Sequence, residues 1–126
     1  MDVTPLVKDG AKIIQAYADG QFRISGEVYN SAVVVFENRV VSWDVSKSID
    51  ALELSDFDAL IDMKDDTDVF LLGTGKTMAF LSPEIRQRLK SKGLHLEMMD
   101  TGAACRTYNV LMAEGRRVAA ALLLHR

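Results

Sequence analysis

The chain has 126 residues, of which 48% are hydrophobic and 26% are charged, and its formal net charge is −3. This length and balance are typical of one globular domain with its own core, so we expect a single domain that spans residues 1–126. The acidic balance offers no basic patch of the kind that binds nucleic acid, which excludes nucleic acid as an expected partner. One cysteine excludes an intrachain disulfide, and with only two histidines we predict no metal site and no cofactor.

The start of the chain and its apolar runs bear on location. The opening MDVTPLVKDGAKII has neither the basic first segment nor the apolar centre of a secretory signal, and it is not an Arg-rich presequence. The longest apolar run, residues 118–124, is far shorter than the roughly 20 residues that a membrane-spanning helix needs. We therefore expect a cytoplasmic protein without a membrane span.

The N-terminal third is predicted to be rich in β-structure. Runs of β-branched and aromatic residues predict strands at 13–18, 21–24, 32–36 and 40–45. Asp19 and Gly20 are the kind of dipeptide that forms a two-residue hairpin turn between the first two strands. Trp43 lies between two polar residues, and we expect its ring to pack on the sheet rather than on a ligand.

The middle of the chain combines a helix with an acidic loop. Ser55 is a suitable cap for a helix over residues 56–63, with Phe57, Leu60 and Ile61 on its inner side. Four aspartates between residues 62 and 68 match a calcium loop in charge, but the central glycine and the final glutamate of that motif are missing. We interpret this segment as a solvated turn.

A glycine-rich segment follows a short buried strand at 69–72. The sequence GTGKT at 73–77 ends like a phosphate-binding loop, but that motif needs a glycine where Phe70 stands. It also lacks the third glycine of the dinucleotide-binding fingerprint. Nucleotide hydrolysis is therefore disfavoured.

A second helix is predicted to begin at Ser82 and Pro83 and to end at Gly93. Its outer face carries four basic residues, Arg86, Arg88, Lys90 and Lys92. Such a stripe is usually a solvated face, and the alternative is contact with an acidic partner. A strand at 94–99 follows, so the segment from 69 to 96 forms a right-handed crossover if its two strands are parallel.

The last helix opens with very small residues directly after that strand. Asp100 and Thr101 supply capping oxygens, and residues 102–104 leave the first turn open. Unpaired N–H groups and the helix dipole make such a turn a natural anion site. The alternative is that these residues are small because the helix packs tightly on the sheet. Gly115 ends the helix, and residues 118–124 predict a strand buried on both faces.

The loops at 73–76 and 100–106 are predicted to meet at one edge of the sheet, because each follows one of two parallel strands. Together with Lys76 and Arg106 they would form a small, locally positive pocket. The predicted ligand-binding residues are Gly73, Thr74, Gly75, Lys76, Asp100, Thr101, Gly102, Arg106 and Asn109. No catalytic residues are predicted.

Four segments carry a family resemblance: FRISGEVY at 22–29, GTGK at 73–76, SPEIR at 82–86 and, most specifically, MDTGAACRTYNVLMAEGRRVAAALL at 99–123. They are similar to the Mth938-like family, also called the DUF498 domain. The resemblance implies an α/β fold with three layers. In it a central mixed sheet of about five strands has helices on one side and additional β-structure on the other.

The same resemblance bears on function. Mitochondrial members of the family include a respiratory complex I assembly factor, another animal member is associated with adipogenesis, and no catalytic set comes with the family. It implies a non-catalytic, assembly-factor-like binding domain that recognises a membrane-complex subunit or the assembly machinery. Two alternatives stay open, namely a small anion bound in the pocket, and an enzyme that uses Cys105 or Arg106 there. Cys105 shares the inner arc of its helix with Ala104 and Tyr108, which favours a buried structural thiol.

Overall fold

Two β-sheets and three α-helices make up the computed structural model, which describes residues 10–45 and 48–125. The smaller sheet is antiparallel, with the order β1 (Ile14–Ala16), β2 (Phe22–Ile24) and β3 (Glu27–Tyr29). Asp19 and Gly20 have φ values of 60° and 72° in the turn before β2, which confirms the predicted hairpin. β3 is not among the predicted strands.

The larger sheet is mixed and has the order β5-β4-β8-β6-β7. Its strands are β4 (Val33–Phe36), β5 (Arg39–Ser42), β6 (Val69–Gly73), β7 (Leu96–Met99) and β8 (Val118–Leu122). β4 is antiparallel to β5 and β8, whereas β6 is parallel to β7 and β8. The parallel pairing expected around the second helix is therefore confirmed.

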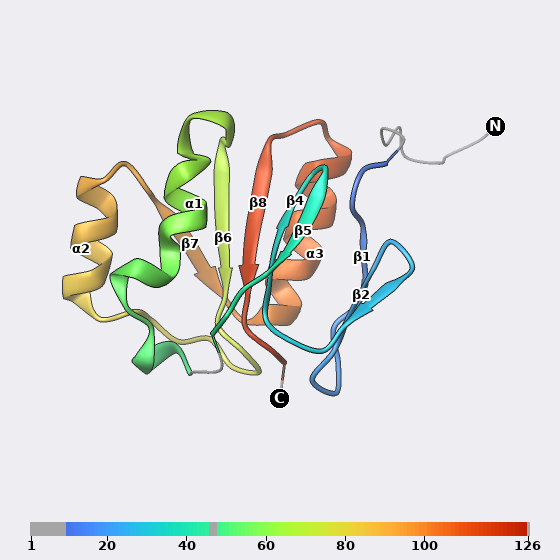
Figure 1. Ribbon diagram of the computed structural model, residues 1–126, viewed down its shortest axis with the longest axis horizontal. Helices are drawn as coiled ribbons and strands as arrows, with labels where there is room; N and C mark the ends of the chain where they lie inside the picture. The colour runs from blue at the N-terminus through green and yellow to red at the C-terminus, as the bar shows by residue number, and fades with distance from the viewer. Residues whose placement is uncertain (1–9, 46–47, 126) are drawn as a thin grey trace.

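Helices cover both faces of the larger sheet (Figure 1). One face carries α1 (Asp58–Asp62), α2 (Pro83–Ser91) and short 3-10 segments at Ile49–Ala51, Leu54–Phe57 and Lys64–Asp66. The other face carries α3 (Thr101–Ala113) together with the smaller sheet. The three-layer α/β architecture is confirmed, and the expected layer of additional β-structure is present. That layer also contains α3, so the helices are not confined to one side.

Crossover handedness explains why the helices are divided between the faces. The connection from β6 through α2 leads outward to β7, whereas the connection from β7 through α3 leads back past β6 to β8. Parallel crossovers are right-handed almost without exception. Two right-handed crossovers that move in opposite directions across one sheet place their helices on opposite faces.

β8 is the strand that both cores share, and all five of its residues are buried. Ala119 and Ala121 belong to the core beneath α1 and α2. Val118, Ala120 and Leu122 belong to the core beneath α3. The run reads as unbroken apolar sequence because a strand covered on both faces has no solvated side.

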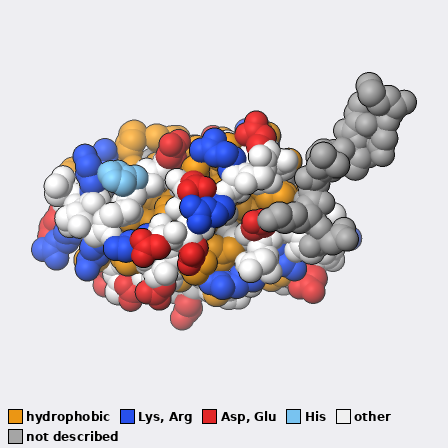
Figure 2. All heavy atoms as spheres, turned by 90° about the horizontal axis from the view of Figure 1, so that it is seen from above, with side chains coloured by type: hydrophobic (Ala, Val, Ile, Leu, Met, Phe, Trp, Pro, Cys, Tyr) orange, Lys and Arg blue, Asp and Glu red, His pale blue; other side chains and the backbone are white. Residues whose placement is uncertain are grey.

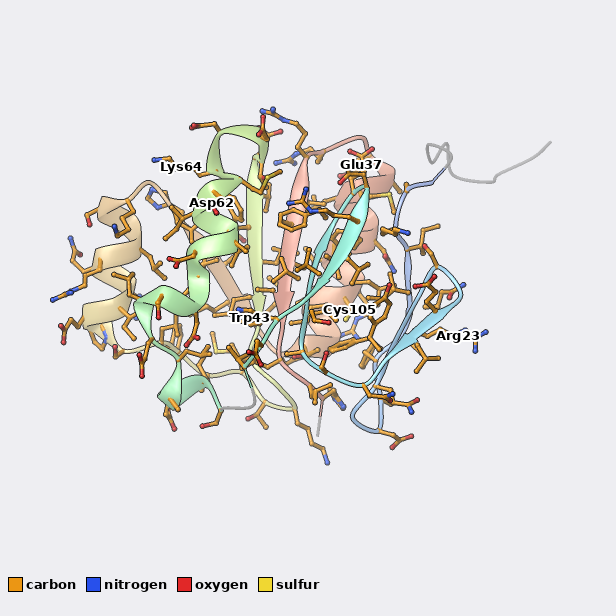
Figure 3. All side chains as sticks on the ribbon, viewed as in Figure 1. Arg23, Glu37, Trp43, Asp62, Lys64 and Cys105 are labelled. Carbon is orange, nitrogen blue, oxygen red and sulfur yellow. The ribbon has the colours of Figure 1, made fainter. Side chains whose placement is uncertain are left out.

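The approach to α1 differs in detail from the prediction. The helix predicted over 56–63 begins as a 3-10 turn. The cap of this turn is Glu53, whose backbone N–H donates to Asp56 Oδ2 at 2.7 Å. Ser55 is therefore not the cap. Trp43 lies against this turn, with its Nε1 donating to the carbonyl of Asp56 at 2.7 Å and its ring edge-on to Phe57 (Figure 3). The expectation that Trp43 packs in the core is confirmed.

Candidate functional site

The loop after β6 and the start of α3 are in direct contact. The backbone N–H of Thr101 donates to the carbonyl of Gly75 at 2.8 Å, and the N–H of Gly75 donates to Thr101 Oγ1 at 2.9 Å. A Cβ added at Gly73 would lie 2.9 Å from Thr101 Oγ1, so only glycine allows this approach. The predicted meeting of the two loops at one edge of the sheet is confirmed, because hydrogen bonds join them directly.

Thr101 is the residue that ties this edge together. Its side chain is fully buried and donates from Oγ1 to the carbonyl of Leu123 at 2.7 Å while accepting from Gly75. One hydroxyl therefore links the loop after β6, the start of α3 and the end of β8. Both hydrogen-bonding roles of this predicted ligand-binding residue are used inside the fold.

Thr74 has a similar internal role within its own loop. Its Oγ1 lies 2.7 Å from the carbonyl of Thr77, to which it donates, and accepts from the backbone N–H of Ala79 at 3.1 Å. The side chain therefore holds the loop in a compact turn. Thr74 also lines a cavity that Lys76 shares, and ligand binding by Thr74 and Thr101 stays a prediction.

The first turn of α3 is capped and covered. Asp100 Oδ1 accepts from the backbone N–H of Ala103 at 2.8 Å, which confirms Asp100 as the cap. The ring of Tyr17 lies over Gly102, where an added Cβ would be 3.0 Å from ring atoms. Arg106 Nη1 donates to the Tyr17 hydroxyl at 2.8 Å. Gly102 is thus small because the ring of Tyr17 packs on it, whereas the alternative left open by the sequence was packing of this turn on the sheet.

Asn109 joins α3 to the smaller sheet. Its Oδ1 accepts from the backbone N–H of Ile14 at 3.0 Å, and its Nδ2 donates to the carbonyl of Ile14 at 2.8 Å. The amide therefore pairs with β1 as a neighbouring strand would. This role is a long-range one, and the sequence pattern contains no signal for it.

Lys76 faces solvent and lines a cavity of 460 Å³. The cavity walls include Thr77, Ser48 and Asp50, but Arg106 is not part of them. The two predicted cations therefore have different surroundings: Lys76 lines the cavity, whereas Arg106 is exposed and donates to the Tyr17 hydroxyl. Binding of a small anion by these residues stays a prediction.

Cys105 lies on the buried side of α3 (Figure 3) and is only 2% exposed. Burial raises the pKa of its thiol from 9.0 to about 12, against a smaller lowering by the charge of Arg106. A nucleophilic cysteine needs a thiolate near neutral pH. This thiol is instead held neutral, as a small apolar side chain of the core.

Within residues 10–45 and 48–125, no three or more side chains of the His, Cys, Asp or Glu types are grouped where they would share a metal ion. Over the same ranges, no helix combines the length and the apolar character that crossing a bilayer requires.

Two exposed apolar side chains extend this region of the surface. Met78 and Phe80 follow the glycine-rich loop and are 47% and 57% exposed. The guanidinium of Arg86 lies 5.3 Å from the centre of the Phe80 ring, which holds the ring beside α2. The sequence predicts a brief strand or an extended link over residues 77–81, and the structure has no strand there.

A second cavity, of 380 Å³, lies next to this surface between α2 and β7. Its apolar lining includes Leu81, Leu89, Leu94, Leu96 and Met98. Its polar lining is basic or neutral, with Arg86, Gln87, Lys90 and His95. A histidine and several Lys or Arg side chains gather at the α2 end of the molecule in Figure 2. The sequence predicts the basic stripe but not the apolar cavity beside it.

The chain is similar to known proteins over most of its length. The model of the family described as "Protein of unknown function (DUF498/DUF598)" matches residues 14–123. An uncharacterised protein of Rhodobacter capsulatus is 35% identical over 114 residues, which cover 90% of this chain and 86% of that protein.

A relative with a named role and a solved structure extend this comparison. The NADH dehydrogenase [ubiquinone] 1 alpha subcomplex assembly factor 3 of Xenopus tropicalis is 33% identical over 125 residues, which cover 96% of this chain and 67% of that protein. The solution NMR structure of a Bordetella pertussis protein, described as a Mth938-like domain, is 29% identical, with a TM-score of 0.79 and coverage of 98% of this chain and 92% of that one. The chain therefore belongs to the DUF498/DUF598 family and shares its Mth938-like fold.

Proposed function

We propose that this chain is a non-catalytic binding domain with an assembly-factor-like role, which holds a protein subunit of a membrane complex while that complex is built. The observation that carries the proposal is the 33% identity, over 96% of this chain, to a protein named as an assembly factor of NADH dehydrogenase. One third of that relative lies outside the shared region, so its complete role includes parts that this chain does not match.

The surface beside the glycine-rich loop supports protein binding. Met78 and Phe80 expose apolar area two and four residues after Lys76, and methionine and aromatic side chains are enriched in protein interfaces. A protein partner would remove this area from water.

The alternatives have less support. Arg106 is hydrogen-bonded to Tyr17, and two N–H groups of the first turn of α3 already donate to Gly75 and Asp100. An anion at this turn would compete with Gly75 and Asp100 for these two N–H groups, although Arg106 keeps further N–H donors. Chemistry at Cys105 would require ionisation of a buried thiol whose pKa is raised to about 12.

The proposal is tested by deleting the gene in its source organism and separating membrane complexes on native gels. We expect a subassembly of one membrane complex to accumulate, and cross-linking in cells with the wild-type chain to capture one subunit of it. Restoration by Phe80→Ser should be incomplete, because the variant loses exposed apolar contact area.

Val110→Ser is the matched control, because Val110 on α3 is also 57% exposed but lies on another element. It should restore assembly fully. Normal complexes in the deletion strain, together with no cross-linked subunit, would refute the proposed function.

A further inference from the structure

β7 is an end strand of the larger sheet. It pairs with β6 on one side, and among the described residues no strand pairs with its other side. Unpaired strand edges present rows of N–H and C=O groups that readily accept another strand. The open edge of β7 therefore offers backbone hydrogen bonds to a partner.

The pairing with β6 shows which backbone groups of β7 face outward. The carbonyl of Met99 accepts from the N–H of Thr74 at 2.9 Å, so the backbone groups of Met99 point toward β6. The direction of the backbone N–H and C=O groups alternates along a strand. Those of Glu97 therefore also point toward β6, and those of Leu96 and Met98 point to the open edge. Two N–H groups and two carbonyls are thus placed for an added strand.

The same two residues line the 380 Å³ cavity between α2 and β7. Their side chains are partly buried against the core beneath α1 and α2. An added strand would direct every second side chain toward this face of the sheet. The cavity, with Leu81, Leu89 and Leu94 in its walls, would receive apolar side chains from such a strand.

The charge of the cavity indicates which partner fits. Its lining contains Arg86, Lys90 and His95 but no Asp or Glu, although the whole chain has a net charge of −3. Arg88, on the same helix, is already paired with Glu84 at 3.2 Å and is not part of the lining. Acidic side chains on an incoming segment would therefore meet uncompensated positive charge.

We propose that the open edge of β7 binds, by strand addition, an extended segment of a partner protein in which every second side chain faces the cavity and these cavity-facing side chains are apolar and acidic in turn. This inference rests on the proposed function, because it names the surface and the chemistry of the partner. A second copy of this chain is a poorer occupant, since pairing two β7 edges would bring two basic surfaces together.

The probe is a pool of short synthetic peptides in which every second residue is in turn Glu and one of Val, Leu or Phe, with Thr at the positions between them. The control pool has Lys in place of Glu. The isotope-labelled chain is followed by NMR, and affinity is measured by fluorescence anisotropy. We expect the acidic pool to shift the amide signals of Leu96 and Met98 and to slow their hydrogen exchange. The Lys pool should bind at least about tenfold more weakly.

Two kinds of variant separate the contribution of backbone hydrogen bonds to peptide binding from the contribution of charge. Met98→Pro removes an outward N–H without removing a bond to β6, and the double variant Arg86→Glu, Lys90→Glu reverses the charge without changing the backbone. Each should weaken binding at least about tenfold, whereas Arg88→Glu should change it by less than about twofold. Should Met98→Pro fail to fold, the charge variants and the wild-type amide signals decide the question.

Several results would overturn the inference. They are equal binding of both pools, no binding of the acidic pool, unchanged signals at Leu96 and Met98, and self-association of the chain through β7 in place of peptide binding. If a folded Met98→Pro variant still captures the cross-linked subunit in cells, strand addition is wrong and the proposed function stands. If the wild-type chain captures no subunit and its deletion has no effect on assembly, both fail.

Discussion

Thr101 and Cys105 occupy neighbouring turns of α3, and burial has different consequences for them. The hydroxyl of Thr101 is satisfied by Gly75 and Leu123, so its burial stabilises the fold through hydrogen bonds. The thiol of Cys105 needs no strong partner, because it behaves as a small apolar group. In both cases a polar atom beside the start of a helix serves packing rather than chemistry.

The thiol of Cys105 should be unreactive in the folded chain. We expect iodoacetamide to label the folded chain at pH 7.5 far more slowly than the chain unfolded in urea, because the thiol is buried and its pKa is raised to about 12. Mass spectrometry of timed samples measures both rates. Equal rates would show that the thiol is accessible in the folded state.

The raised pKa of the Cys105 thiol also affects the free energy of unfolding. The folded state binds the thiol proton more tightly than the unfolded state, whose pKa is near 9.0. The contribution of the neutral thiol to the free energy of unfolding is therefore complete below about pH 9 and declines as the pH rises toward 12. Cys105→Ala should reduce this decline, while Tyr108, whose pKa is raised by burial, adds a decline in the same direction.

At the scale of elements, the attachment of β1 to α3 depends on few polar contacts. Asn109 pairs both ends of its amide with Ile14, and Tyr108 donates to the carbonyl of Lys12 at 2.9 Å. Apolar contacts of Ile14, Phe22 and Ile24 complete the attachment. The smaller sheet thus covers α3 through one helix face rather than through pairing with the larger sheet.

Asn109→Ala should loosen this attachment. Loss of two hydrogen bonds should lower the free energy of unfolding by about 1 to 3 kcal/mol and speed hydrogen exchange at the Ile14 amide. Chemical denaturation and exchange measured by NMR test the two effects. Val110→Ala is the control, because its side chain is exposed and should change neither quantity much. Unchanged exchange at Ile14 would mean that apolar packing alone holds β1.

At the scale of the whole molecule, one sheet separates two cores that depend on each other. β4, β6 and β8 contribute alternate residues to both cores. Loss of packing on one face would therefore expose apolar groups and disturb strands that the other face needs. A single domain over residues 1–126 stays a prediction.

A single tryptophan and a single cysteine report on the two faces separately. Trp43 belongs to the core beneath α1 and α2, and Cys105 to the core beneath α3. We expect Trp43 fluorescence and pulsed labelling of Cys105 to give the same midpoint in urea, because the two cores unfold together. Two clearly different midpoints would show that each face unfolds on its own.

Local sequence determined much of this protein. Asp19 and Gly20 determine their hairpin turn, Ser82 and Asp100 cap their helices, and the apolar run of β8 indicates burial on both sides. These features depend on residues close together in the chain, so a pattern reveals them. Parallel pairing of β6 and β7 followed from the connecting helix, and it correctly placed the two loops at one edge.

Only the tertiary structure shows which side chains cover the end of the sheet where the two loops meet. Tyr17 lies 85 or more residues before the turn that it covers, and nothing near Gly102 or Arg106 in the sequence indicates its approach. The same holds for Asn109 with Ile14 and for the cavity between α2 and β7. Helix ends and turns are set by neighbours in the chain. Whether a polar group is open to a ligand or has a partner within the protein depends on which distant side chain the fold brings against it.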